Sequence, residues 1–131
     1  MKAATLKNAP PVSARALDEW FPELPEALEK AVSDYGLAET SDWQPLDELS
    51  SATRFEEIET DGESAIYESG RFVAPASVHV TLVYEPNSDE PTEMADSYPA
   101  RVYFKIVPKG KNKRPSVAVD RIEVDTASFY E

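Results

Sequence analysis

The segment that most constrains the fold is Ser77–Glu85, in which apolar and polar side chains alternate along nine residues. Its apolar members are Val78, Val80, Leu82 and Tyr84. A period of two places these side chains on one face of a β-strand and leaves His79 on the other. Such a strand is typical of an antiparallel sheet that buries one face, and Val102, Phe104 and Ile106 repeat the pattern. We therefore predict a sheet with one apolar face.

The region after Thr53 has the composition of several strands separated by turns. The predicted strands are Phe55–Thr60, Ser64–Glu68, Arg71–Glu85, Ala100–Val107 and Ser116–Asp125. Asp61-Gly62 and Ser69-Gly70 are dipeptides typical of hairpin turns. Pro75 predicts a bulge or bend in the long third strand, and a slip in the apolar phase predicts a bulge near Asp120-Arg121. The acidic segment Pro86–Pro99 is predicted to be a long loop.

Two helices are predicted before the strands. Ser13 can cap a short helix over Ala14–Phe21. Pro25 suits the first turn of a second helix, and Gly36 suits a left-handed stop at its end. The apolar stripe of this second helix consists of Leu24, Leu28, Val32 and Tyr35. After Pro45 we expect only a short helical turn. The predicted fold class is therefore α+β, with two N-terminal helices packed on one face of an antiparallel sheet of about five strands.

The length of 131 residues favours one domain. Residues 1–12 contain Pro10-Pro11 and no acidic residue, so we expect a flexible N-terminal arm before a single α+β domain over 13–131. The sequence has no cysteine, no apolar run long enough for a membrane span and no signal-peptide pattern. These features predict a cytoplasmic protein without membrane contact.

No motif with established chemistry stands out. His79 is the single histidine, and catalysis there would need a carboxylate or a nucleophile beside it on a neighbouring strand. The acidic loop over 87–96 lacks the spacing and the glycine of a calcium-binding loop. The segment Pro108–Pro115 lacks the first glycine and the strand-to-helix setting of a phosphate-binding loop. We therefore expect no enzyme activity, no cofactor and no metal site.

Charge is distributed unevenly along the chain. The formal net charge is −12, and residues 18–96 hold 21 of the 25 acidic residues but only three basic ones. Residues 97–114 hold six basic residues and no acidic one. The field of the acidic part would repel nucleic acid and anionic lipid and attract a basic partner. We therefore predict a non-catalytic acidic protein-binding module, of the inhibitor, immunity or chaperone-like accessory kind. Its partner would be a basic macromolecule, and direct nucleic-acid binding is not expected.

The candidate partner-binding residues follow from this hypothesis. The acidic candidates are Glu23, Glu26, Glu29, Asp34, Glu56, Glu57, Glu59 and Asp61, and the basic candidates are Lys109, Lys111, Lys113 and Arg114. The basic candidates form the tip of a predicted hairpin. This tip could dock on the acidic part of a second copy, which would give head-to-tail self-association.

Three alternatives remain open. The acids could imitate a phosphate backbone, which would make the protein a DNA-mimic inhibitor of a nucleic-acid-binding protein. A pocket between helices and sheet could serve a small ligand or an enzyme reaction. Its aromatic lining would consist of Trp20, Phe21, Trp43, Tyr84 and Phe104. Finally, the acidity could be an adaptation to a high-salt habitat, in which case stability would fall at low salt.

Overall fold

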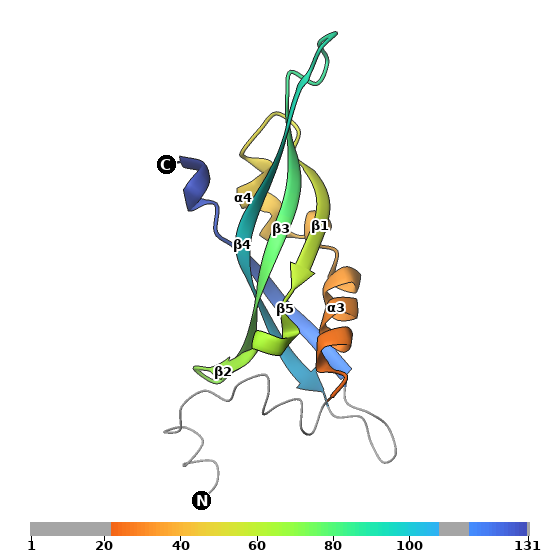
Figure 1. Ribbon diagram of the computed structural model, residues 1–131, viewed down its shortest axis with the longest axis vertical. Helices are drawn as coiled ribbons and strands as arrows, with labels where there is room; N and C mark the ends of the chain where they lie inside the picture. Colours follow the sequence, from red (N-terminus) through yellow and green to blue (C-terminus); the bar gives the residue numbers. More distant parts are fainter. Residues whose placement is uncertain (1–21, 108–115, 131) are drawn as a thin grey trace, which may run out of the picture.

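The computed structural model describes residues 22–107 and 116–130 (Figure 1). Its helices are α3 (Leu24–Tyr35) and the short α4 (Gln44–Asp47), and its strands are β1 (Arg54–Thr60), β2 (Ile66–Glu68), β3 (Arg71–Tyr84), β4 (Thr92–Val107) and β5 (Ser116–Val124). The helices precede an antiparallel five-strand sheet, which confirms the predicted α+β class. The predicted arm over 1–12 and the predicted helix Ala14–Phe21 lie outside the described residues. None of the described helices combines the length and the apolar character that a membrane crossing requires.

α3 is the second of the two predicted helices and forms where the sequence places it. Pro25 stands in its first turn, and Gly36 ends it with a φ of 65°, a left-handed conformation that suits glycine. The buried stripe of α3 joins one core with the apolar side chains of β3. The shared core includes Leu24, Leu28, Val32, Val78, Val80 and Leu82. We call the sheet face that carries this core the inner face, and the opposite one the outer face.

The strand order is β1-β3-β4-β5, with all neighbours antiparallel, and β2 also pairs with β3. The predicted turn at Ser69-Gly70 is confirmed, with φ values of 53° and 80° that match a two-residue hairpin. The predicted hairpin at Asp61-Gly62 is wrong, because β1 and β2 pair with successive parts of β3 along the same edge. A 3₁₀ turn over Gly62–Ser64 interrupts this edge without reversing the chain.

Pro75 lies inside β3 without the bulge that we predicted. β3 and β4 pair residue by residue across this position. On the other side of β3, β1 ends at Thr60 and β2 begins at Ile66, so the missing N–H of proline falls in the gap between them. The carbonyl of Pro75 accepts a hydrogen bond from the N–H of Asp61 (2.9 Å) on that side. The gap therefore makes the proline compatible with a long strand.

β4 begins at Thr92 rather than at the predicted Ala100, so the end of the predicted acidic loop is strand. Its first residue pairs with Tyr84, the last residue of β3, which leaves a short connection between the two strands. The acidic start of β4 has low strand propensity, yet it pairs with β3 along its length. Figure 1 shows the resulting β3–β4 ribbon running along the molecule. Pairing with a strong strand therefore overrides local propensity here.

The bulge predicted near Asp120-Arg121 is confirmed. Tyr103 pairs with Arg121 and Phe104 with Val119, which leaves Asp120 as the extra residue of β5. The bulge restores the apolar phase of the strand, so that Ile122 is only 1% exposed and joins the core. It also places Arg121 on the outer face, opposite Tyr103.

Candidate functional site

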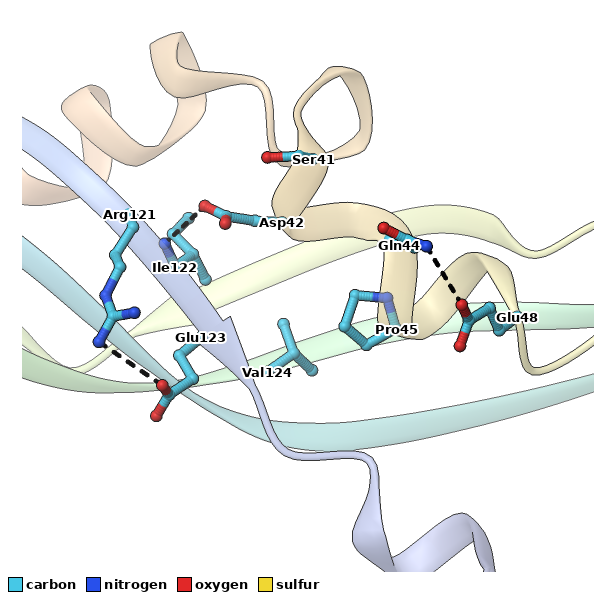
Figure 2. A pocket seen from close by; sticks show the side chains of 9 residues that line it. All are labelled: Ser41, Asp42, Gln44, Pro45, Glu48, Arg121, Ile122, Glu123 and Val124. Carbon is cyan, nitrogen blue, oxygen red and sulfur yellow. Dashed lines mark hydrogen bonds and ion pairs between the residues drawn. The ribbon is translucent and has the colours of Figure 1, made fainter.

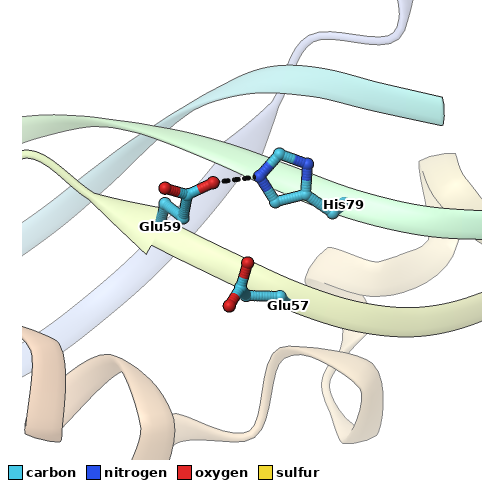
Figure 3. A group of neighbouring side chains, drawn as sticks. All are labelled: Glu57, Glu59 and His79. Atoms are coloured by element: carbon cyan, nitrogen blue, oxygen red, sulfur yellow. Dashed lines mark hydrogen bonds and ion pairs between the residues drawn. The ribbon is translucent and has the colours of Figure 1, made fainter.

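Three side chains of metal-ligating type meet on the outer face of the sheet, near its β1 edge (Figure 3). Glu57 and Glu59 come from β1, two residues apart and therefore on one face, and His79 lies directly opposite Glu57 on β3. One oxygen of each carboxylate and one ring nitrogen of the histidine lie within 4.8 Å of one another. Among residues 22–107 and 116–130, this is the one group of three such side chains. We call it the Glu–His cluster.

Hydrogen bonds on both sides orient the imidazole of His79. Its Nε2 lies 2.5 Å from Oε1 of Glu59, and its Nδ1 lies 2.6 Å from Oγ of Ser97, the residue opposite His79 on β4. The side chains of His79 and Glu59 are 31% and 66% exposed, so a ligand from solvent can reach both. The imidazole ring is therefore held between Glu59 on β1 and Ser97 on β4, and it remains accessible to solvent on the side of Glu59.

Glu56 lies beside the Glu–His cluster but belongs to a separate network. It is the extra residue at a bulge in β1, and its Oε2 accepts hydrogen bonds from Thr81 Oγ1 (2.8 Å) and Arg54 Nε (3.3 Å). The bond from Thr81, followed by that from Arg54, lowers the pKa of Glu56 below its usual value. Glu57, in contrast, has no hydrogen-bond or ion-pair partner among the described residues. The site therefore offers the carboxylates of Glu57 and Glu59 to a ligand.

This donor set fits a divalent cation. Carboxylate oxygens suit Mg²⁺, Ca²⁺ and Mn²⁺, and imidazole nitrogen suits first-row transition metals, so Mn²⁺ is compatible with both kinds of donor. A metal-bound histidine usually has its second ring nitrogen hydrogen-bonded to an orienting group, and Ser97 occupies that position for His79. The cluster could therefore hold one cation at the edge of the sheet without rearrangement of the backbone.

A hollow of about 330 Å³ lies between α4 and β5 (Figure 2). Its main charged groups already have partners. Oδ2 of Asp42 accepts hydrogen bonds from the N–H of Ile122 (2.9 Å) and the hydroxyl of Tyr35 (2.5 Å), and Arg121 lies 3.6 Å from Glu123. The hydrogen bond from Ile122 to Asp42 holds β5 against the helical segment, so we assign this hollow a structural role.

The predicted partner-binding acids do not form one row. Those on α3 are Glu23 at its N-terminal boundary, Glu26, Glu29 and Asp34. They lie in the helix layer, where Asp34 is paired with Lys30 (2.9 Å), whereas Glu56, Glu57 and Glu59 lie on the outer face. A hollow of about 290 Å³ at the β1 edge is lined by both Glu29 and Glu57, and Asp61 accepts a hydrogen bond from Ser64 (2.6 Å). The acids are thus divided between two layers.

Several other predicted site residues lie outside the described part of the chain. They are Lys109, Lys111, Lys113 and Arg114 between β4 and β5, together with Trp20 and Phe21. Self-association through the basic tip therefore stays a prediction. Of the remaining aromatic residues proposed to line a pocket, Phe104 is 1% exposed, and Trp43 and Tyr84 pack against the same core. These three side chains stabilise the interior of the protein.

Sequence reasoning treated His79 as an isolated strand histidine and assigned Glu57 and Glu59 to a partner surface. Alternation correctly predicted that His79 faces away from the core. It did not predict that β1 pairs with β3 in the register that places Glu57 opposite His79. The signal that could have found the cluster is the same-face spacing of Glu57 and Glu59, taken together with the single histidine of the sequence on the neighbouring strand β3.

Comparison with known proteins identifies the family. A family model described as predicted pPIWI-associating nuclease matches residues 19–130, which is well over half of the chain. No curated protein and no solved structure matches the chain. The match contradicts the predicted non-catalytic acidic binding module and indicates a nuclease-associated function. The chain belongs to the family of predicted pPIWI-associating nucleases.

Proposed function

We propose that this protein is a nuclease domain that hydrolyses phosphodiester bonds at the Glu–His cluster with the help of a divalent cation. One observation carries the proposal: Glu57, Glu59 and His79 converge on an open sheet face in a chain of a predicted nuclease family. The family description also supports a pPIWI protein as the partner with which the domain acts.

The residues of the cluster have separate roles in this proposal. The carboxylates of Glu57 and Glu59 and Nε2 of His79 would hold the cation. With a cation at Nε2, the proton of the neutral imidazole would sit on Nδ1 and be donated to Ser97 Oγ, which would keep the lone pair of Nε2 directed at the site. A cation bound there would polarise a phosphoryl oxygen of the substrate.

The local charge also favours a cation-dependent reaction. Without a cation, two carboxylates close together on the outer face repel an approaching phosphodiester. The protein as a whole, with a net charge of −12, adds to this repulsion. A bound cation would offset the two carboxylates and so favour the approach of substrate to the cluster. We expected no enzyme activity because the sequence alone places no carboxylate beside His79, and in the structure Glu57 and Glu59 lie beside it.

Cleavage of end-labelled oligonucleotides by the purified chain tests the proposal, in the presence of Mn²⁺, Mg²⁺ or EDTA. We expect cleavage with Mn²⁺ and none with EDTA. Glu57→Gln, Glu59→Gln and His79→Gln should each lower the rate about a hundredfold or more. Glu56→Gln is the matched control, because it makes the same change one position away in a carboxylate that Thr81 and Arg54 already engage.

Two results would overturn this function. One is cleavage that persists at the parental rate in the three cluster variants. The other is absence of cleavage with every divalent cation, both for the chain alone and for the chain mixed with its pPIWI partner.

A further inference from the structure

Three arginine side chains gather round one tyrosine on the outer face of the sheet. The Cζ atoms of Arg71 on β3 and Arg121 on β5 lie 4.9 Å and 4.6 Å from the ring centroid of Tyr103 on β4. Arg101 lies two residues before Tyr103 on the same face of β4. Guanidinium groups stack on aromatic rings in this way, and the contact restricts their rotation. We call these four residues the arginine cluster.

Arg71 and Arg101 form no ion pair among the described residues, although Asp125 lines the same hollow as Arg101. Arg121 is 3.6 Å from Glu123, and Glu123 and Glu68 both act on Arg101. These two carboxylates face three guanidinium groups, all of them exposed. Cations held close together repel one another, so an anion that contacts several of them relieves the repulsion. The cluster is thus suited to bind an anion with oxygen atoms in several directions, such as a phosphate.

A continuous depression joins the arginine cluster to the Glu–His cluster. One hollow of about 320 Å³ is lined by Glu59 and Ser77, and another of about 570 Å³ is lined by Pro99 and Arg101. The two hollows share Pro75 and Ala76. Besides these small side chains and prolines, the lining includes the acidic side chains of Asp61, Glu123 and Asp125. The outer face therefore has a shallow path between the two clusters.

The length of this path follows from strand geometry. Ser97, Pro99, Arg101 and Tyr103 alternate along β4 and lie on the outer face, with Ser97 bonded to His79. At about 3.3 Å per residue, Arg101 lies about 13 Å and Tyr103 about 20 Å along the strand from Ser97. A stacked nucleic-acid strand rises about 3.4 Å per nucleotide, so about six nucleotides would span the path, and fewer if the strand is extended.

We propose that the arginine cluster binds the backbone of a single-stranded nucleic acid and directs the strand along β4 to the Glu–His cluster. Phosphates contact the guanidinium groups, and bases can stack on their exposed faces. Tyr103 is a positioning residue that orients the arginines. A single strand fits better than a duplex, because the basic region is narrow and the surrounding acids repel the wide backbone of a duplex. This inference rests on the proposed nuclease function for its direction, but the binding step does not require the cation.

Fluorescence anisotropy of labelled 12-nucleotide single strands, measured in EDTA, tests this binding step apart from catalysis. DNA and RNA strands form separate arms, and a duplex of the same length forms a third. With three phosphate contacts, log K should fall with log salt concentration with a slope of about −2, and Arg71→Gln, Arg101→Gln or Arg121→Gln should reduce that slope by about 0.7 each. Each of these substitutions should weaken binding about tenfold at low salt.

Two further variants make the test specific. Arg54→Gln is the control, because Arg54 lies on the same face but is engaged by Glu56 and Glu93 at the other end of the sheet, so affinity should not change. Tyr103→Leu removes no charge, yet it should weaken binding and flatten the salt dependence because the guanidinium groups lose their orientation. Circular dichroism identifies a variant that fails to fold, and the exposed arginine substitutions then decide the result.

The outcomes separate the two proposals. Equal affinity of the arginine variants, Arg54→Gln and the parent would overturn the arginine-cluster inference, as would tighter binding of the duplex. Cleavage at the Glu–His cluster would in that case still support the nuclease function. Strand binding that depends on Arg71, Arg101 and Arg121 would support the inference even if no cleavage occurred, which would count against the nuclease function alone.

Discussion

Asp42 connects its own helical segment with α3 and with β5, so its replacement should lower the stability of the fold by an amount that its hydrogen bonds set. Its Oδ2 accepts hydrogen bonds from the hydroxyl of Tyr35 at the end of α3 (2.5 Å) and from the N–H of Ile122 on β5 (2.9 Å). Asp42→Ala removes a charged acceptor from two partly buried donors. At a net value of about 1–2 kcal/mol per bond, we expect the free energy of unfolding to fall by about 2–4 kcal/mol.

Urea denaturation followed by far-UV circular dichroism measures this loss, and thermal denaturation should show a melting temperature lower by about 10 °C. Tyr35→Phe is the matched variant, because it removes one of the two bonds and should cost about half as much. A double-mutant cycle of Asp42→Ala with Tyr35→Phe should give a coupling energy of about 1 kcal/mol. A loss below about 0.5 kcal/mol for Asp42→Ala, or strict additivity in the cycle, would refute the reasoning.

Two further predictions concern packing and pH. A Cβ atom at Gly62 would lie 2.7 Å from the Cα atom of Pro25. Gly62→Ala should therefore displace α3 and lower the free energy of unfolding, measured by urea denaturation, by about 1–3 kcal/mol. An unchanged urea midpoint would contradict this prediction. Burial, followed by a hydrogen bond to Asp96, raises the pKa of Tyr98 above its usual value near 10. Because the unfolded chain releases this proton at a lower pH than the folded protein, the contribution of Tyr98 to stability is fully present below pH 10. Above pH 10 the free energy of unfolding should fall by up to about 1.4 kcal/mol per pH unit, and Tyr98→Phe should remove this fall. Equal slopes of the free energy of unfolding against pH in the parent and the variant would contradict this prediction.

Local pattern predicted the elements that bury a regular stripe. α3 has apolar residues at helical spacing and a glycine stop, and β3 alternates along most of its length, with Val73 and Val83 as exceptions, so both formed as expected. The bulge at Asp120 was predictable because the apolar phase before and after it differs by one residue. In these cases one short stretch of sequence contains the whole cause of the structure.

Features set by pairing between strands were not predictable in the same way. The start of β4 is acidic and has low strand propensity, and its structure comes from residue-by-residue pairing with β3. The edge formed by β1 and β2 depends on a turn at Gly62–Ser64 that continues the chain instead of reversing it. A dipeptide such as Asp61-Gly62 favours a hairpin locally, but burial of Gly62 against Pro25 selects a different geometry.

The candidate site was missed for the same reason. Glu57, Glu59 and His79 were all noted in the sequence, and each is unremarkable by itself. Their chemistry depends on the register between β1 and β3, which fixes Glu57 opposite His79, and on the contact of His79 with Ser97 of β4. Net charge was also misleading, because it sums residues on both layers and does not show that Arg71, Arg101 and Arg121 lie together on the outer face.

Binding of Mn²⁺ to the full chain tests the central claim most directly, because it needs neither a substrate nor the pPIWI partner. Electron paramagnetic resonance or isothermal titration calorimetry should detect one Mn²⁺ site. The account predicts that Glu57→Gln, Glu59→Gln and His79→Gln each abolish this site while Glu56→Gln retains it. A chain that binds no Mn²⁺, or one whose binding is the same in all four variants, would contradict the account.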